Sequence, residues 1–234
     1  MTTLSLISPC YNESDNIRDF VEDWHRELAA RIDDFEIIIV DDCSTDATPD
    51  LLKALQAKYP RLEVLTNATN RRYGAAVMRG LRHAAGQYVI WTDSDYSHRP
   101  SDFWKLWRRR EAFDGVWGIR RVDQRDSLGR IFFTIGNILL IGLIFNIRLK
   151  DPNCAFKLFR RDALMPVIDA IRVHPIMTTT KIAIRARQAG LSIEEVPVEF
   201  LERTRGQGSI DGVRQIGAAV EGVRELMAFR LRGR

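Results

Sequence analysis

Residues 88–95 read Tyr-Val-Ile-Trp-Thr-Asp-Ser-Asp, and this stretch decides how the rest of the chain is interpreted. Its first four residues are β-branched or aromatic and follow Gly86, which predicts a short buried strand. Two carboxylates then follow, Asp93 and Asp95, separated only by Ser94. Because ligands bind at the carboxyl ends of strands in open α/β sheets, the pair predicts a site for Mg²⁺ or Mn²⁺. A lone Asp-x-Asp is more often a polar turn, so the other strands must decide.

The chain before residue 88 alternates short apolar segments with segments of helical periodicity. Strands are predicted over residues 4–8, 35–40 and 62–65, and helices start near residues 14, 51 and 75. Strands that alternate with helices form βαβ units, which build a parallel sheet with right-handed crossovers. We therefore expect an α/β fold in which helices flank a mostly parallel sheet.

The chain after residue 95 is less regular. It predicts helices over residues 100–111, 131–147 and 181–188, and strands over 115–119, 155–159 and 193–200. From residue 210, apolar residues recur in steps of three and four: Val213, Ile216, Val220, Val223 and Met227. This spacing predicts an amphipathic C-terminal helix.

Acidic residues follow three of the predicted strands. Glu13 comes after the first strand, Asp41 and Asp42 after the second, and Asp93 and Asp95 after the fourth. Such a cluster repels itself unless a cation or hydrogen-bond donors stabilise it. Each acid alone is typical of a solvated strand end, whereas all of them at one sheet edge favour a ligand site. The sequence has no Gly-x-Gly-x-x-Gly or Gly-x-x-x-x-Gly-Lys motif, so neither a dinucleotide fold nor a phosphate loop is predicted.

Charge and cysteine usage narrow the class of protein. The net charge is +4, and residues 203–234 hold seven arginines against three acidic residues, which predicts an anionic surface nearby. Three widely spaced cysteines predict a reducing compartment, and no signal peptide is recognisable, so a cytoplasmic location is expected. The basic stretch 104–110 lacks a nucleic-acid-binding motif, and no nucleic-acid partner is expected.

Several motifs together resemble a known family. Pro9-Cys10-Tyr11-Asn12-Glu13, Val40-Asp41-Asp42-Cys43-Ser44-Thr45-Asp46, Asn70-x-x-x-Gly74 and Asp93-Ser94-Asp95 resemble family 2 glycosyltransferases. Residues 151–161 and 195–198 look like the dolichyl- or polyprenyl-phosphate sugar synthase branch of that family. The resemblance implies a GT-A-type, Rossmann-like catalytic domain over residues 1–209. Its nucleotide-sugar half would cover about 1–120 and its acceptor half about 121–209, with residues 210–234 as a basic amphipathic tail helix.

The resemblance also implies roles for the acidic residues and their neighbours. The resemblance assigns the contacts with base and ribose to Pro9, Tyr11, Glu13 and Asp42. It also places Asp93 among the nucleotide-binding residues. Asp93 and Asp95 would hold Mg²⁺ or Mn²⁺ on the diphosphate. Ser97 and His98 follow the pair, and the sequence leaves open whether either completes the metal shell.

Arginines are the expected partners of a phosphate acceptor, because a guanidinium binds phosphate through two hydrogen bonds. By resemblance, Arg120 and Arg125 take this role, with Arg130 as a third candidate. Arg203 lies in a glycine-containing stretch that resembles a loop closing over the diphosphate. For each arginine, the alternative is a solvated surface charge.

Lys181 departs from the family pattern, because many relatives carry glutamate there and those that glycosylate saccharides need an acid nearby as general base. A polyprenyl phosphate needs no base, since its oxygen is ionised near neutral pH with a second pKa of about 6. The resemblance therefore implies inverting transfer of a sugar from a nucleoside-diphosphate sugar, GDP-mannose or a UDP-hexose, to a polyprenyl (dolichyl or undecaprenyl) phosphate. Transfer to a saccharide hydroxyl is one alternative, and a catalytically inactive nucleotide-sugar-binding or scaffold protein is another.

The most apolar segment, 131–147, and the tail helix leave two alternatives open. Thr134, Asn137, Asn146 and Arg148 make residues 131–149 a poor membrane-spanning helix. The first alternative is a buried core helix together with a dimer or capping helix. The second is that both lie on the cytoplasmic membrane face as a peripheral attachment, with the tail arginines near anionic headgroups or with the tail bound to a membrane-protein partner.

Overall fold

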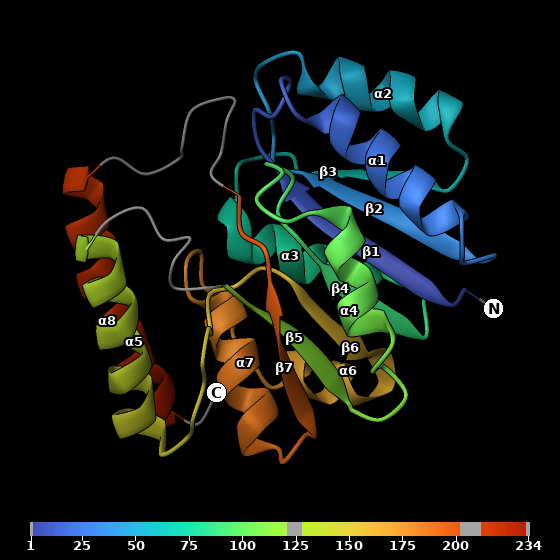
Figure 1. Cartoon of the computed structure of the whole chain (residues 1–234). Helices are drawn as coiled ribbons and strands as arrows, with labels where there is room; N and C mark the ends of the chain where they lie inside the picture. Colours follow the sequence, from blue (N-terminus) through green and yellow to red (C-terminus); the bar gives the residue numbers. More distant parts are fainter. Residues whose placement is uncertain (1, 121–127, 202–211, 233–234) are drawn as a thin grey trace.

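The computed structural model describes residues 2–120, 128–201 and 212–232, with the backbone alone for 128–134, 212–216 and 218–219. Seven strands form one sheet in the order β3-β2-β1-β4-β6-β5-β7 (Figure 1). The strands are β1 Leu4–Cys10, β2 Phe35–Asp41, β3 Leu62–Thr66, β4 Tyr88–Trp91, β5 Gly115–Arg120, β6 Lys157–Arg160 and β7 Ile193–Val198. The helices are α1 Ile17–Ala29, α2 Thr48–Lys58, α3 Arg72–His83, the 3-10 turn η1 Pro100–Asp102, α4 Phe103–Trp107, α5 Leu128–Phe145, α6 Arg161–Asp169, α7 Thr178–Gln188 and α8 Gly212–Arg232.

The sheet is mostly parallel, which confirms the predicted fold class. β1 pairs in parallel with β2 and β4, β2 with β3, and β5 with β7. Only β6 runs antiparallel to both of its neighbours, β4 and β5. The order 3-2-1-4 brings the carboxyl ends of β1, β2 and β4 to one edge, and that edge is where the sequence predicts the ligand site.

Both faces of the sheet are covered by helices, so the central strands are buried on both faces, and every residue of β1 and β4 is buried. Successive residues alternate between the two faces: Leu6 and Ile39 belong to one core cluster, and Ile7 and Ile38 belong to the other. The first cluster includes the buried aromatic residues of α1 and α4, and the second includes α3, α6 and α7. This two-sided burial fixes the register of the strands, because a slip by one residue would exchange the two faces.

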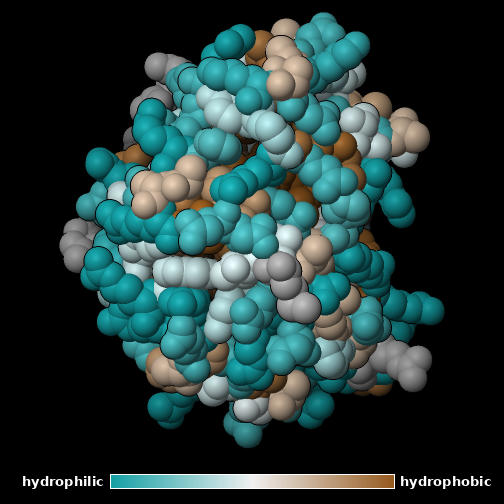
Figure 2. Space-filling model, turned by 90° about the vertical axis from the view of Figure 1, so that its right-hand side faces the viewer, coloured by the Kyte–Doolittle hydropathy of each residue, from teal (hydrophilic) through white to brown (hydrophobic). Residues whose placement is uncertain are grey.

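α5 and α8 lie side by side at the edge of the molecule (Figure 1), and the rings of Phe145 and Phe229 meet at 5.7 Å between their centroids. Their large exposed apolar side chains are Ile135, Leu139 and Leu143 on α5 and Val220, Val223, Met227 and Leu231 on α8. On the opposite side of the molecule hydrophilic residues predominate (Figure 2). Across the residues that the structure describes, no helix has both the length and the apolar character needed to span a bilayer.

Several elements differ in their bounds from the expectations of the sequence, and one helix was not predicted. The helix predicted over 100–111 is shorter, because α4 ends at Trp107 and turns follow it. The strand predicted over 155–159 is β6 and begins at Lys157. The sequence does not predict α6, because Pro166 lies inside it and an internal proline normally argues against a helix.

Candidate functional site

The acidic strand ends meet at the carboxyl edge of β1, β2 and β4. Cys10 and Asp41 are register partners, and the amide of Asp42 donates to the carbonyl of Cys10 at 2.9 Å. The loop after β4 is tied to the same place, because the Ser94 hydroxyl donates to the carbonyl of Pro9 at 3.0 Å. The structure therefore gathers at one edge the loops that the sequence assigns to a single site.

Two of the predicted nucleoside-binding carboxylates are buried and already hydrogen-bonded. Asp42 accepts from the side-chain amide of Asn67 at 2.6 Å and from the backbone amide of Arg71 at 2.9 Å. Glu13 accepts from Asn16 at 2.8 Å. These donors fix the orientation of each carboxylate, and Asn67 and Asn16 are site residues that the sequence analysis did not identify.

The remaining predicted nucleoside contacts, Pro9 and Tyr11, differ sharply in exposure. Pro9 is buried within β1, whereas Tyr11 is 43% exposed. An exposed aromatic ring beside buried polar groups provides a face on which a planar ligand can stack. Of these two predicted contacts, Tyr11 is therefore the one whose side chain is accessible from solvent.

The three loops at this edge each contain a non-glycine residue in the left-handed region. The φ angles are 54° at Asn12, 65° at Cys43 and 63° at Tyr96. Each such residue costs about 1 kcal/mol. Cross-loop hydrogen bonds stabilise this backbone, since the amide of Asn12 donates to Ser44 Oγ at 2.9 Å and the amide of Thr45 donates to Asn12 Oδ1 at 2.8 Å. Strained residues that persist in this way are typical of functional loops.

Asp93 and Asp95 form an electrostatically strained pair. Burial, and then the charge of Asp95, raise the pKa of Asp93 to about 7, although Arg120 acts in the opposite direction. A bound cation would remove this repulsion, and hard carboxylate oxygens suit Mg²⁺ or Mn²⁺. Within the described residues no group of three acidic, histidine or cysteine residues is arranged to hold a metal ion. Asp93 and Asp95 would be the residues that hold such a cation.

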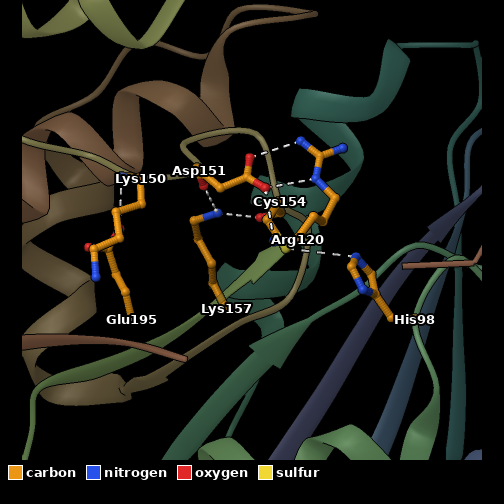
Figure 3. Close-up of polar contacts among 7 residues, drawn as sticks. All are labelled: His98, Arg120, Lys150, Asp151, Cys154, Lys157 and Glu195. Carbon is orange, nitrogen blue, oxygen red and sulfur yellow. Dashed lines mark hydrogen bonds and ion pairs between the residues drawn. The ribbon is translucent and has the colours of Figure 1, made fainter. Parts of the chain in front are cut away.

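His98, which follows the acidic pair, is buried rather than exposed. Its ring is buried, stacks on Phe156 at 5.0 Å and places Nε2 3.8 Å from the sulfur of Cys154 (Figure 3). Burial, and then the charge of Arg120, lower the pKa of His98 to about 4, so the ring is neutral at physiological pH. Ser97 is buried as well, and its hydroxyl has no hydrogen-bond partner among the described residues.

Arg120 ends β5 and reaches the same region, because its charge acts on both Asp93 and His98. It is paired with Asp151, whose carboxylate accepts from Arg120 Nε at 2.7 Å and from Nη2 at 2.8 Å (Figure 3). Arg125 and Arg203 lie outside the described residues, and only the backbone of Arg130 is described. The structure thus brings one predicted cation to the acidic edge.

A family model for glycosyl transferase family 2 matches residues 5–167 of the chain. The chain belongs to glycosyltransferase family 2. This family 2 glycosyltransferase is 28% identical over 223 residues to dolichyl-phosphate beta-glucosyltransferase ALG5A of Trichomonas vaginalis, a match that covers 90% of this chain and 69% of that protein. It is 26% identical to ALG5C of the same organism, over 97% of this chain and 71% of that protein.

Solved structures share the fold of this family 2 glycosyltransferase. Glucosyl-3-phosphoglycerate synthase from Mycobacterium tuberculosis, in complex with phosphoglyceric acid, has a TM-score of 0.70 at 19% identity and covers 98% of this chain and 80% of its own. The mannosyltransferase PcManGT from Pyrobaculum calidifontis, in complex with GDP-Man and Mn²⁺, has a TM-score of 0.62 at 19% identity, over 97% of this chain and 69% of its own. At this identity the likeness establishes the fold.

The departure at Lys181 receives a structural explanation in this family 2 glycosyltransferase. Lys181 is 1% exposed, and its amine forms an ion pair with Glu225 of α8 and donates to the carbonyl of Arg172 at 3.2 Å. The amine also lies 5.3 Å from the centroid of the Phe229 ring. The side chain therefore attaches α8 to the body of the protein.

Sequence reasoning missed Asp151 and Lys157 as individual functional candidates. Both lie within residues 151–161, which the sequence analysis used only to assign the family branch. Lys157 is fully buried, which is rare for lysine and marks a specific role. The sequence signal that could have identified Lys157 is a lysine among the apolar residues of a predicted strand.

Proposed function

We propose that this family 2 glycosyltransferase transfers a hexose from a nucleoside-diphosphate sugar to a polyprenyl phosphate, with inversion at the anomeric carbon. One observation carries the proposal: the strained carboxylates Asp93 and Asp95 lie near a half-buried arginine, Arg120, whose charge acts on Asp93. A carboxylate pair suits the cation of a nucleoside diphosphate, and an arginine suits a second phosphate. The names of the relatives, dolichyl-phosphate beta-glucosyltransferases, favour a glucosyl group and a lipid phosphate.

The donor would bind along the acidic edge. Asp42 and Glu13 accept hydrogen bonds from base and ribose, and Tyr11 stacks on the base. Asp93 and Asp95 would hold Mg²⁺ or Mn²⁺, which neutralises the charge of the leaving nucleoside diphosphate. Neither carboxylate acts as the base, because both face the leaving group and the acceptor oxygen attacks from the opposite side of the sugar.

The acceptor would bind on the arginine side. A phosphate monoester with a second pKa of about 6 is already ionised at neutral pH, so its attack needs no general base. Arg120 orients the phosphate and stabilises its charge, and Arg125 and Arg203 supply further cations. Lys181 stands where many relatives carry an acid, and its amine forms an ion pair with Glu225. The absence of an acid at this position agrees with a reaction that needs no general base.

A lipid acceptor also needs a route from the bilayer. The exposed apolar side chains of α5 and α8 and the exposed arginines Arg224, Arg230 and Arg232 together form a surface of the kind that binds anionic membranes. We propose that this surface lies on the cytoplasmic face of the membrane as a peripheral attachment. The lipid phosphate would then reach Arg120 without leaving the headgroup region.

The direct test offers UDP-glucose and GDP-mannose to the purified protein with undecaprenyl or dolichyl phosphate in mixed micelles. The expected product is a glycosyl polyprenyl phosphate whose formation requires Mn²⁺ or Mg²⁺. The same donors with saccharide acceptors test transfer to a hydroxyl. Turnover on saccharides alone would contradict the proposal, and tight donor binding without turnover on any acceptor would instead indicate a nucleotide-sugar-binding protein.

A further inference from the structure

The guanidinium of Arg120 is held by an unusually complete set of hydrogen bonds to Asp151. Nε and Nη2 donate to the two carboxylate oxygens at 2.7 and 2.8 Å, and the backbone amide of Arg120 donates to Oδ2 at 3.2 Å. The side chain of Asp151 is only 1% exposed, whereas that of Arg120 is 21% exposed. The carboxylate is thus the buried end of the pair, and the guanidinium is the end that can meet a ligand.

Asp151 is in turn held by Lys157 at the start of β6. The amine of Lys157 donates to the backbone carbonyl of Asp151 at 3.4 Å and to that of Cys154 (Figure 3). Lys157 is fully buried beside the ring of Trp117, its register partner on β5. A lysine whose amine donates to two carbonyls of one turn fixes the backbone of that turn. The carboxylate of Asp151 is therefore held by a rigid backbone.

The guanidinium also packs on an aromatic ring. The centre of the Arg120 guanidinium lies 5.1 Å from the centroid of Phe200, and Phe200 meets the ring of His98 at 5.7 Å. The arginine is therefore fixed by a carboxylate along one edge and by a ring below its plane. An arginine fixed in this way loses little side-chain entropy when it binds a ligand.

We propose that Asp151 and Lys157 are positioning residues that aim the guanidinium of Arg120 at the acceptor phosphate. The proposal rests on the proposed function, because it names residues that prepare the acceptor side of the same site. Asp151 uses the Nε–Nη2 edge of Arg120, and a guanidinium can bind phosphate bidentately through its Nη1–Nη2 edge. Asp151 takes no proton in the reaction: although burial raises its pKa, the hydrogen bonds and charge of Arg120 lower it overall.

The test compares Asp151→Asn, Lys157→Met and Arg120→Lys in steady-state transfer to a short-chain polyprenyl phosphate. A matched control is Asp114→Asn, which removes the carboxylate that pairs with Arg160 at 2.9 Å just before the opposite end of β5. We expect Asp151→Asn and Arg120→Lys to raise KM for the acceptor about tenfold or more. Lys157→Met should act in the same direction with a smaller effect, and the KM for the donor should stay within about twofold of the wild type.

The double variant with Asp151→Asn and Arg120→Lys gives a readout that a merely structural role would not produce. If Asp151 acts through Arg120, the double variant should be no worse than the more impaired single variant, since residues of one network are not additive. Independent losses that multiply would overturn the proposal, as would wild-type acceptor KM in folded Asp151→Asn. Melting curves of every variant check the fold, and Arg120→Lys and Lys157→Met keep the test available if Asp151→Asn does not fold.

Calorimetric binding of farnesyl phosphate without donor separates this proposal from the proposed function. Wild-type protein that binds farnesyl phosphate but transfers no sugar to any lipid phosphate would contradict the proposed function alone. In that case, weaker binding by Asp151→Asn than by Asp114→Asn would still support the positioning role. Binding that is equal in wild type, Arg120→Lys and Asp151→Asn, or no binding by the wild type, would overturn it.

Discussion

The acidic edge at β1, β2 and β4 and the basic region around β5, β6 and α7 stabilise their charges in opposite ways. At the acidic edge, Asp42 is satisfied by neutral donors, and Asp93 keeps a repelling neighbour. In the basic region, Arg120 and Lys181 each have a carboxylate partner. The first region thus keeps a repulsion that a bound cation would relieve, whereas in the second Arg120 and Lys181 are each held by a carboxylate.

This difference indicates which kind of substitution each region tolerates. Removal of a carboxylate from the acidic edge removes a ligand-binding group but relieves repulsion, so function should suffer more than stability. Removal of a carboxylate from the basic region leaves a cation without that carboxylate partner. Either the stability of the fold or the orientation of the cation should then suffer.

The largest effect is expected from Asp95→Asn. Loss of one carboxylate of the pair should lower transfer by roughly two to three orders of magnitude, as for the loss of one preorganised electrostatic group in other enzymes. A chelator should have a similar effect on the wild type. The melting temperature of the metal-free variant should not fall, because the substitution removes a neighbour that raises the pKa of Asp93.

The control for this variant is Asp50→Asn, an exposed acid at the start of α2. It should keep wild-type transfer. Full activity of Asp95→Asn, or of the wild type in chelator, would remove the metal role from the acidic edge.

The next largest effect is a loss of stability on Glu225→Ala. This change leaves the amine of Lys181 buried without its ion-pair partner, and a broken buried pair costs about 3 kcal/mol. Denaturant unfolding measures the change, and Glu221→Ala is the matched control one turn earlier on α8. Glu221 is 55% exposed, and its carboxylate lies 3.5 Å from Nε2 of His174. Because exposed ion pairs contribute little, Glu221→Ala should lower the free energy of unfolding by less than about 1 kcal/mol.

A rescue variant sharpens the same comparison. Lys181→Met combined with Glu225→Ala removes both charges, and it should recover much of the stability lost in the single variant, because apolar replacements of buried ion pairs are often neutral. If the double variant is less stable than Glu225→Ala alone, the ion pair does not account for the attachment of α8.

Membrane attachment through α5 and α8 predicts a smaller effect. Leu143 and Leu231 are 84% and 83% exposed, so Leu143→Glu and Leu231→Glu should leave the melting temperature unchanged. Sedimentation with phosphatidylglycerol-containing vesicles should show binding weakened by about tenfold in the double variant. Ala57→Glu, at an exposed position of α2, adds the charge of one such substitution elsewhere and should bind like the wild type. Unchanged vesicle binding in the double variant would remove these helices from the membrane surface.

The smallest effect is a pH dependence of Mn²⁺ binding. The pKa of Asp93 is raised to about 7, so the folded protein holds a proton there below neutral pH and the cation must displace it. Affinity should therefore fall as pH falls, by about threefold between roughly pH 7.5 and 6.5. Titration of Mn²⁺ by electron paramagnetic resonance measures this, and the dependence should be absent in Asp93→Asn, whose overall affinity is weaker. A wild-type affinity that is flat over this range would contradict the strained pair.

The same contrast explains how much could be predicted from the sequence. β4 has the bounds that its apolar run predicts, and the acids that follow β1, β2 and β4 meet because parallel strands share one carboxyl edge. Local pattern and topology were sufficient there. Arg120 and Asp151 are 31 residues apart, and no periodicity links them, so their pairing depends on the antiparallel insertion of β6 between β4 and β5.

The helices of the second half show the same limit. The helix at residues 131–147 and the tail were predicted as helices, but their contact through Phe145 and Phe229 depends on tertiary packing. The family pattern alone shows that Lys181 stands where many relatives carry an acid. Its pairing with Glu225 could not, because the partner lies on a helix that the sequence analysis assigned to a separate tail.

Glu225 is synthesised well after the lysine that it neutralises, because 44 residues separate the two. At a translation rate of roughly 5–20 residues per second, this interval lasts about two to nine seconds. During that time β1, β2, β3 and β4 can pair through neighbouring βαβ units, while α7 still carries an uncompensated amine. Completion of α8 is therefore a late step in biogenesis, and chains that end before residue 225 should form the acidic edge but remain substrates for chaperones and proteases.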